Sequence, residues 1–408
     1  MAAGFLQKSV IIVLSIVIIV SSIPTLDSNE PISNGGTPKS IDETHDNSMN
    51  DLPPSVEEVA ETEELTGEEP SSRHSRNNQV DEWPMFRHDM RRTGNTTSRA
   101  PNINNIKWTH QTPITDYTWG YCGSPAVAGG LVFLGGQRPD VFRAIDAETG
   151  VQSWPYNVGN RVTSSPTVAN NRVLFTSYSR MVYSLNINTG LEVWTAGLAN
   201  YPDSSPTVYQ GKVYVGDGEA DYVASSPSHM YCLDENTGAV RWIFNSVGQI
   251  ACSPTIVDDL VIFGSYDGFV YALPATDPNG DLSIDDTEII WRFDAGSRIV
   301  ASAAVVDGTV YIGAWNGKLY ALPFTDPSGD GFISEDEIIW TFETGNQNWC
   351  SAGVANGRVF VGSHDHYIYA LPQADPNGDR VISESEVLWK YQTTDKIWSS
   401  PAIAGGKV

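Results

Sequence analysis

Short runs of Val, Ile, Tyr and Phe, separated by small and polar residues, recur along the chain after about residue 120. Each run has the length of a β-strand and is bounded by Gly, Asn or Asp, which favour turns. The order of runs repeats, each time from a small-residue start. These starts lie at Ser124, Ser165, Ser205, Ser253, Ser302, Ser351 and Ser400. The intervals between them are 41, 40, 48, 49, 49 and 49 residues, so the pattern predicts a repeat protein.

Each repeat contains four short strands. A Val-rich strand is followed by a Gly or Asn turn, a second strand such as residues 212–216, a hairpin, and an aromatic strand such as residues 270–273. The hairpins contain Asp267-Gly268 and Asn316-Gly317, pairs that favour two-residue type I′ turns. The fourth strand carries a tryptophan: Trp154, Trp194, Trp242, Trp291, Trp340 or Trp389. Four strands in about 40 to 50 residues predict an all-β fold, a β-propeller of four-stranded antiparallel blades.

A solenoid would stack the same units in an open array. Residues 106–109 look instead like a fourth strand without a blade of its own, with Trp108 in the tryptophan position. We expect this strand to complete the last blade and close a ring. The chain ends at residues 405–408, in the opening of a second strand. The pattern therefore predicts six complete blades and a partial seventh.

Residues 144–154 read Ala-Ile-Asp-Ala-Glu-Thr-Gly-Val-Gln-Ser-Trp, and partial copies end at Trp194 and Trp242. This segment resembles the A-x-D-x-x-T-G-x-x-x-W motif of the quinoprotein-type, pyrroloquinoline-quinone-like propeller repeats. Residues 83–94, which begin Trp-Pro-Met-Phe-Arg-His-Asp, are similar to the segment that leads into the repeats in many secreted members of that family. The resemblance covers residues 83–408 and implies that each indole packs between adjacent blades, where a buried aromatic stabilises the fold. Propellers of this family commonly have seven or eight blades, so the resemblance also implies a full-length ring of seven or eight.

Nine extra residues lie between the third and fourth strands of the fourth, fifth and sixth repeats. The inserts read DPNGDLSIDDTE (residues 277–288), DPSGDGFISEDE (residues 326–337) and DPNGDRVISESE (residues 375–386). They resemble the twelve-residue calcium loops of EF-hands and dockerins, where oxygens at positions 1, 3, 5, 7, 9 and 12 surround the ion. The metal-binding residues predicted in this way are Asp277, Asn279, Asp281, Ser283, Asp285, Glu288, Asp326, Ser328, Asp330, Phe332, Ser334, Glu337, Asp375, Asn377, Asp379, Val381, Ser383 and Glu386.

Other positions of the inserts bear on the calcium prediction. Position 8 is always isoleucine, an anchor for the loop, and Ser334 with Glu337 forms an S-x-x-E capping box that the third insert repeats. Position 6 is glycine only at Gly331; Leu282 and Arg380 replace it, which predicts weaker or distorted first and third sites. The alternative is a polar hairpin with Asx turns and no metal. Three copies in register favour calcium, with a dissociation constant of about 10⁻⁴ to 10⁻³ M.

The N-terminus predicts export. An uncharged apolar run, residues 10–20, follows Lys8, so residues 1–24 are interpreted as a signal peptide or an N-terminal membrane anchor. Residues 25–80 are rich in Glu, Asp, Ser, Pro and Asn, which predicts a disordered acidic linker before a propeller of residues 81–408. We therefore expect an extracellular or cell-surface protein that meets a membrane only through its N-terminal segment.

A formal net charge of −25 argues against nucleic acid as a partner, because polyphosphate binding needs a basic surface. The same charge suits divalent cations and favours solubility. Cys122, Cys232, Cys252 and Cys350 permit three disulfide pairings, but Cys252 and Cys350 occupy equivalent positions two repeats apart. We expect buried, mostly unpaired thiols.

Three functions compete. Resemblance to quinoproteins implies a pyrroloquinoline-quinone-dependent alcohol or sugar dehydrogenase, with the quinone in the central channel beside calcium and stacked on two adjacent cysteines. The sequence contains no Cys-Cys pair or nucleophile elbow, and His364 and His366, which flank Asp365, favour an exposed turn over a ligand site. We therefore expect a surface scaffold or binding module for envelope proteins or glycans, similar to the propeller lipoprotein of the outer-membrane assembly machinery. A purely structural surface-layer component is a third alternative.

Overall fold

The computed structural model describes residues 10–13, 16–19, 82–98, 106–110, 123–136, 140–218 and 227–408. The linker predicted at residues 25–80 lies outside these ranges, as does Cys122. Almost all regular structure in the described ranges is β-strand, and the helices there are two single turns, η1 (Glu335–Glu337) and η2 (Glu384–Glu386). None of the described helices is long and apolar enough to cross a membrane. The all-β prediction is confirmed.

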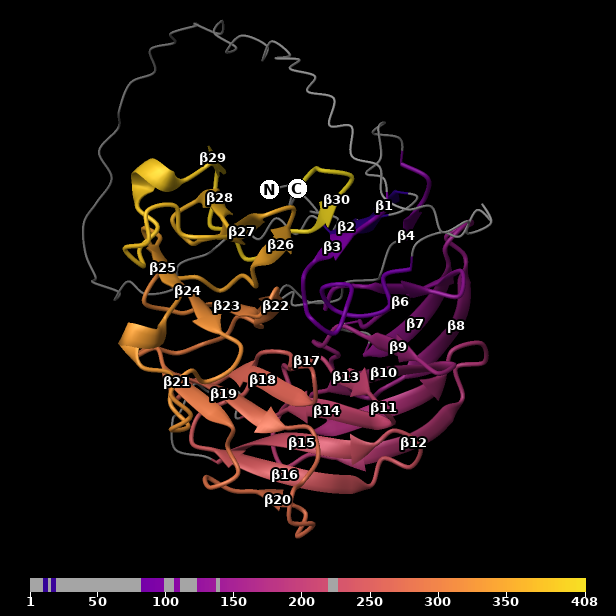
Figure 1. The fold of residues 1–408 in the computed structure, drawn as a ribbon. Coiled ribbons are helices and arrows are strands. Elements are labelled where there is room, and N and C mark those ends of the chain that lie inside the picture. The colour runs from indigo at the N-terminus through magenta and orange to yellow at the C-terminus, as the bar shows by residue number, and fades with distance from the viewer. Residues whose placement is uncertain are drawn as a thin grey trace, which may run out of the picture. The chain divides into compact units, whose positions relative to one another are not determined.

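Within the described residues, six antiparallel sheets form the blades of a propeller; each has four strands of its own, and the sheet of blade 3 gains a fifth, parallel strand from the insert of blade 4 (Figure 1). Each sheet runs in order from an inner first strand to an outer fourth strand. Blade 1 consists of β5 (Ala126–Ala128), β6 (Leu131–Leu134), β7 (Val141–Asp146) and β8 (Gln152–Asn157). Blade 2 consists of β9 (Thr167–Ala169), β10 (Arg172–Ser177), β11 (Met181–Asn186) and β12 (Glu192–Gly197). Blade 3 consists of β13 (Thr207–Tyr209), β14 (Lys212–Gly216), β15 (Ser228–Asp234) and β16 (Val240–Ser246).

The next three blades carry the inserts between their third and fourth strands. Blade 4 consists of β17 (Thr255–Val257), β18 (Leu260–Gly264), β19 (Phe269–Pro274) and β21 (Trp291–Asp294). Blade 5 consists of β22 (Ala304–Val306), β23 (Thr309–Gly313), β24 (Lys318–Pro323) and β25 (Trp340–Glu343). Blade 6 consists of β26 (Gly353–Ala355), β27 (Arg358–Gly362), β28 (Tyr367–Pro372) and β29 (Trp389–Gln392). The prediction of six complete blades is confirmed.

The partial seventh blade is also present. It is represented by β30 (Ile403–Ala404), which pairs in parallel with β3 (Asn95–Thr96). In the strand predicted at residues 106–109, β4 (Thr109–His110) pairs with β1 (Val10–Val13), which forms a hairpin with β2 (Ile16–Ile19). These pairings do not test whether the strand is the fourth of the last blade, so its completion of that blade stays a prediction.

The tryptophans of the repeat dock onto neighbouring blades. Trp154 Nε1 donates to the carbonyl of Ile187 at 2.9 Å, and its indole lies on Gly190, where an added Cβ would be 2.6 Å from the ring. Trp108 uses blade 1 in the same way and donates to the carbonyl of Ala147 at 2.9 Å. Equivalent Nε1 bonds to the next blade are made by Trp194, Trp242, Trp291 and Trp340. The inter-blade role implied by the resemblance is confirmed for these residues.

We expect Gly190→Ala to lower the free energy of unfolding by about 2–4 kcal/mol. Alanine is strained at the φ of 69° found there, and its Cβ would overlap the Trp154 ring. Gly159→Ala is the matched control, because Gly159 has a φ of 76° but no atom within 4 Å of its added Cβ. The control should lower the free energy of unfolding by only about 1 kcal/mol, because it introduces backbone strain alone. Chemical denaturation measures both changes, and equal losses would contradict indole docking.

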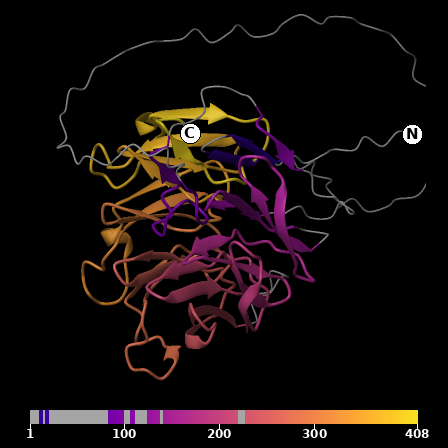
Figure 2. The same cartoon turned by 90° about the vertical axis from the view of Figure 1, so that its right-hand side faces the viewer.

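The small-residue starts form a ladder along the inner strands. The backbone N–H of one repeat serine donates to the hydroxyl of the next at 2.8–3.0 Å. The ladder runs through Ser124, Ser165, Ser205, Ser253, Ser302, Ser351 and Ser400. Between the blades, apolar side chains of facing sheets form the buried clusters of the core, and Figure 2 shows these sheets side by side. Sequence-equivalent residues therefore hold successive blades in register.

The tight turns differ from the prediction. At Asp267-Gly268 only the glycine has a positive φ (97°), and its N–H bonds to the carbonyl of Ser265, as in a type I turn followed by a G1 bulge. The type I′ prediction is therefore wrong there. Both central residues have positive φ in the turn between the first and second strands instead, as at Asp258 (46°) and Asp259 (62°).

Candidate functional site

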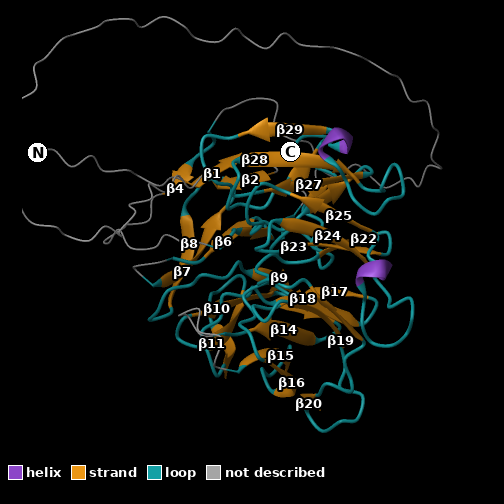
Figure 3. Ribbon diagram, turned by 90° about the vertical axis from the view of Figure 1, so that its left-hand side faces the viewer, coloured by secondary structure: helices purple, strands orange, loops and turns teal. Residues whose placement is uncertain are grey.

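The three inserts occupy equivalent places in blades 4, 5 and 6. Each leaves the third strand of its blade and returns as the fourth, so the loops emerge from the same end of three consecutive sheets. Figure 3 shows η1, η2 and the β20 (Ser283–Ile284) loop toward one side of the propeller. The prediction that the inserts share one edge agrees with this arrangement.

The aspartate at position 1 of each insert accepts hydrogen bonds that support the loop backbone. Asp326 Oδ1 accepts N–H bonds from Ser328 and Gly329 at 3.0 Å each, and Oδ2 accepts one from Gly331 at 2.7 Å. Asp277 and Asp375 accept the equivalent bonds. Desolvation raises the pKa of Asp326, but the bonds from these amides outweigh it and the pKa is lowered overall. The carboxylates at position 1 are thus held ionised and oriented.

Position 12 closes the second and third loops through the predicted capping boxes. Glu337 Oε2 accepts bonds from the backbone N–H and the hydroxyl of Ser334, at 2.8 and 2.9 Å, and η1 starts there. These two bonds lower the pKa of Glu337. In the first loop Asp285 replaces the serine, so Glu288 receives only the backbone N–H, at 3.1 Å. The first loop forms no described helical turn.

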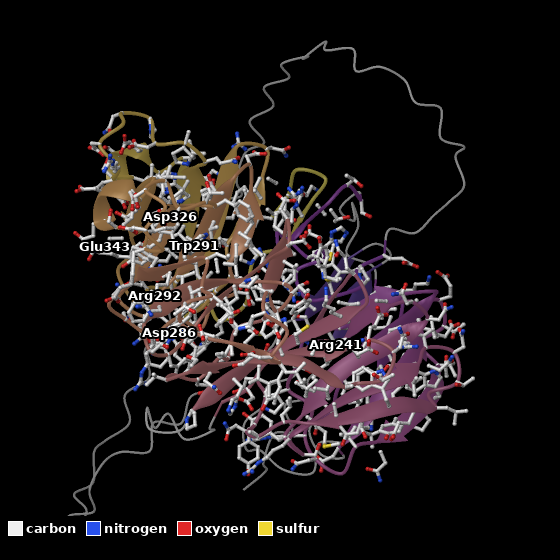
Figure 4. All side chains as sticks on the ribbon, turned by 60° about the horizontal axis from the view of Figure 1, so that its bottom comes forward. Arg241, Asp286, Trp291, Arg292, Asp326 and Glu343 are labelled. Carbon is white, nitrogen blue, oxygen red and sulfur yellow. The ribbon has the colours of Figure 1, made fainter. Side chains whose placement is uncertain are left out.

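Each insert also pairs with the outer strand of the preceding blade, which the sequence analysis did not foresee. β20 in the first insert runs parallel to β16 of blade 3. In the second insert, Ile333 N–H donates to the Arg292 carbonyl at 2.9 Å, and Arg292 N–H donates to the Gly331 carbonyl at 3.0 Å. The third insert bonds to Thr341 of blade 5 in the same way. Figure 4 shows Arg292 between Asp286 and Asp326, which belong to successive loops.

The isoleucines at position 8 secure this pairing. Ile284, Ile333 and Ile382 are 2%, 4% and 2% exposed, in loops whose polar residues are mostly exposed. Burying one isoleucine contributes roughly 1.5–3 kcal/mol. The inserts are therefore inter-blade clamps as well as hairpin extensions. The sequence feature that could have indicated these clamps is the isoleucine at position 8 of all three inserts, an apolar residue within a polar loop.

Position 6 has a left-handed backbone in every insert, with φ of 70° at Leu282, 85° at Gly331 and 68° at Arg380. We expect Leu282→Gly to raise the free energy of unfolding by about 1 kcal/mol, because glycine adopts this conformation without steric strain. Leu282 is 58% exposed, so little packing is lost. Leu282→Ala retains the Cβ and is the control. Thermal denaturation measures the stability of both variants, and equal stabilisation of the two would rule out relief of strain as the cause.

The oxygen set of each loop fits a hard cation in kind and order. Carboxylates stand at positions 1, 5 and 12, an amide or hydroxyl at 3, and a backbone carbonyl is offered at 7, here by Ser283, Phe332 or Val381. Among the described residues, however, no three His, Cys, Asp or Glu side chains converge as they would around a metal ion. The loop carboxylates instead accept bonds from their own backbone amides, for example Asp281 from Ser283 at 2.9 Å.

Other candidate residues are structural in character. Cys232, Cys252 and Cys350 are buried and unpaired, as predicted, and burial raises the pKa of each thiol to about 12. His364 is only 4% exposed and contacts the rings of Trp349 and Trp398, with centroid distances of 5.2 and 4.2 Å. The exposed-turn prediction is wrong for His364, because the hairpin folds inward onto these indoles.

One open depression of about 400 Å³ lies beside the first insert in the described structure. It is lined by Phe244, Asn245, Ser283, Ile284, Asp285, Asp286 and Thr287. Its wall joins the outer strand of blade 3 to the loop of blade 4, so its shape depends on the clamp described above.

One solved structure supports the fold, and two others are reported beside it. The structure of BamB from Moraxella catarrhalis is 18% identical, with a TM-score of 0.50, and the match covers 66% of this chain and 73% of that one. A europium-containing methanol dehydrogenase is 13% identical over 78% of this chain and 87% of its own, with a TM-score of 0.49. A quinohemoprotein alcohol dehydrogenase from Comamonas testosteroni is 14% identical over 80% and 76%, with the same TM-score of 0.49.

No curated protein sequence matches this chain. A family model described as "Outer membrane protein assembly factor BamB", of the pyrroloquinoline-quinone-like repeat type, matches residues 89–229 and 203–330. The two matches together span more than half of the 408 residues. With its four-stranded blades and inter-blade tryptophans, the chain belongs to this family of pyrroloquinoline-quinone-like propeller repeat proteins.

Proposed function

We propose that this chain is an exported, calcium-binding β-propeller that acts as a scaffold or binding module at the cell surface. The observation that carries the proposal is the repetition of one oxygen-rich loop in three consecutive blades. Each copy keeps the ligand types in the same order, the left-handed position 6 and the buried isoleucine. A polar hairpin without a ligand has no need of all three features.

Calcium would supply a fixed positive charge among the carboxylates at positions 1, 5 and 12. Asp326, Asp330 and Glu337, with Ser328 and the Phe332 carbonyl, are the residues that would hold it in the second loop. The loop is already tied to β21 by backbone bonds, so a stiffer loop would stiffen the joint between two blades. Flanking β-strands replace the helices of an EF-hand, so an opening switch is not expected.

Isothermal titration of the full chain with calcium tests this proposal. We expect three sites with dissociation constants of about 10⁻⁴ to 10⁻³ M, and the glycine-bearing second loop should be the tightest. Magnesium should bind more weakly, because it demands a near-ideal octahedral shell. A titration that shows no binding at millimolar calcium would reject the proposal.

A quinone-dependent dehydrogenase is the alternative, and the residues present do not fit it. The resemblance implies a quinone in the central channel on two adjacent cysteines, whereas Cys232 lies in β15 of blade 3, Cys252 precedes blade 4 and Cys350 precedes blade 6. The axis also carries residues 83–96 of the chain itself. Adding pyrroloquinoline quinone and measuring dye-linked alcohol oxidation separates the two functions; activity that depends on the quinone would overturn the scaffold proposal.

The partners we propose are envelope proteins or glycans. The family description names an outer-membrane assembly factor, and the apolar N-terminal run is the basis for proposing export. Surface labelling of intact cells tests the location directly. Protection of the chain until the cells are lysed would place it inside and remove the surface function.

A further inference from the structure

The segment of residues 83–96, here called the axial segment, contacts the innermost strand region of every blade. Its backbone carbonyls or N–H groups bond to inner-strand backbone groups at 2.7–3.1 Å. Those inner-strand residues are Val127, Val168, Ile256, Val305, Val354 and Ile403. Blade 3 is reached by a side chain, since Arg92 donates to the Thr207 hydroxyl. A single short segment thus bonds to six blades and the partial seventh.

Two arginines of the axial segment are buried among backbone carbonyls. Arg87 is 4% exposed and donates to the carbonyls of Pro401 and Ala352, in blades far from its own position in sequence. Arg92 is fully buried and donates to the carbonyl of Pro254 through Nε and Nη2, at 3.3 and 3.2 Å. Desolvation lowers the pKa of Arg87 to about 10 and that of Arg92 to about 9, although both remain cationic near neutrality.

The conformation of the axial segment is held by bonds within the segment and by bonds to the blades. Arg87, His88 and Arg92 have left-handed backbones, with φ of 62°, 74° and 57°, which non-glycine residues adopt only when their surroundings compensate the strain. Gly94 is packed against the Arg87 guanidinium, which an added Cβ would approach to 2.5 Å. Bonds within the coil, such as that from the Gly94 N–H to the Arg87 carbonyl, act together with the bonds from the blades, so the inner strands surround a segment that has turns of its own.

This geometry combines main-chain bonds with buried arginine side chains, and peptide-binding sites use both kinds of contact. We propose that the inner edges of the blades form a peptide-binding site on the axis of the ring, which this chain fills with its own residues 83–96. The ligand class is a peptide that folds into turns and carries two arginines five residues apart. The site accepts the same segment in trans, from a synthetic peptide or from a second copy of the chain.

The test uses the full chain with a protease recognition sequence inserted between Arg99 and Ala100. The purified protein is cleaved there, unfolded in urea, and refolded by dilution with an excess of a fluorescent peptide of residues 81–98. We expect one labelled peptide per chain to co-elute with the ring in gel filtration. If refolding yields aggregate, exchange into the folded, cleaved protein is followed by fluorescence anisotropy instead.

Unlabelled competitor peptides separate specific binding from adhesion. A peptide with Arg87→Ala and Arg92→Ala should compete at least about 100-fold less well, because buried carbonyls lose charged donors. A peptide with Arg91→Ala should compete within about 3-fold of the parent, since Arg91 is exposed. Equal competition by all peptides would overturn the proposal. So would loss of the cleaved segment without any fall in melting temperature.

Discussion

Removing calcium is expected to lower the free energy of unfolding by about 1.4–2.7 kcal/mol for each occupied loop, at roughly 10 mM calcium and the affinity of extracellular modules. With three loops, the total reaches several kcal/mol. The physical reason is that the ion binds the folded loop and has little affinity for the unfolded chain. Thermal melts of the full chain with calcium and with a chelator measure the difference.

The same experiment has a local readout. Each loop is bonded to the outer strand of the preceding blade, so a loop without its ion should open both the hairpin and the inter-blade joint. We expect chelation to increase proteolytic cleavage within residues 275–290, 324–339 and 373–388, where polar residues are mostly exposed. Cleavage elsewhere in the blades should change little.

Matched variants of the second loop distinguish calcium binding from general charge effects. Glu337→Gln removes a carboxylate at position 12, and should abolish the calcium-dependent gain of that loop. Asp336→Asn removes the neighbouring charge at position 11, which is exposed and not a ligand position. The control should keep the full gain. Melting temperatures that change neither with calcium nor with Glu337→Gln would contradict the assignment of Glu337 as a calcium ligand.

Trp291→Ala is expected to destabilise the propeller by about 3–5 kcal/mol, the range for a large aromatic truncated in a core. Trp291 is fully buried, and its Nε1 donates to the Phe324 carbonyl of the next blade at 2.9 Å. Truncation therefore leaves a cavity between two sheets and an unpaired carbonyl. Urea denaturation measures the loss.

Trp389→Ala is the natural control, because Trp389 holds the same repeat position in blade 6 but is 40% exposed. This variant should lower the free energy of unfolding by only about 1 kcal/mol, because the exposed indole makes little packing contact. Comparable losses of unfolding free energy in the two variants would mean that the stabilisation comes from the strand itself and not from docking of the indole between blades.

Arg87 and Arg92 of the axial segment donate to carbonyls that belong to separate repeats. The axial segment was visible in the sequence only as a lead-in resembling that of secreted family members. Its long-range bonds, between residues up to 314 positions apart, could not be read from local pattern.

The sequence by itself determined the repeat, the four strands of each blade, the tryptophan positions and the three inserts, because strand periodicity and turn chemistry are local properties. Only the tertiary structure decided that residues 83–96 fill the axis, that the inserts clamp the preceding blade, that His364 is buried, and that β4 pairs with β1. Even the turn types depended on it, since Asp267-Gly268 joins strands through a bulge. These features rest on contacts between distant segments, whose partners are chosen by packing and by unsatisfied backbone groups once the blades assemble.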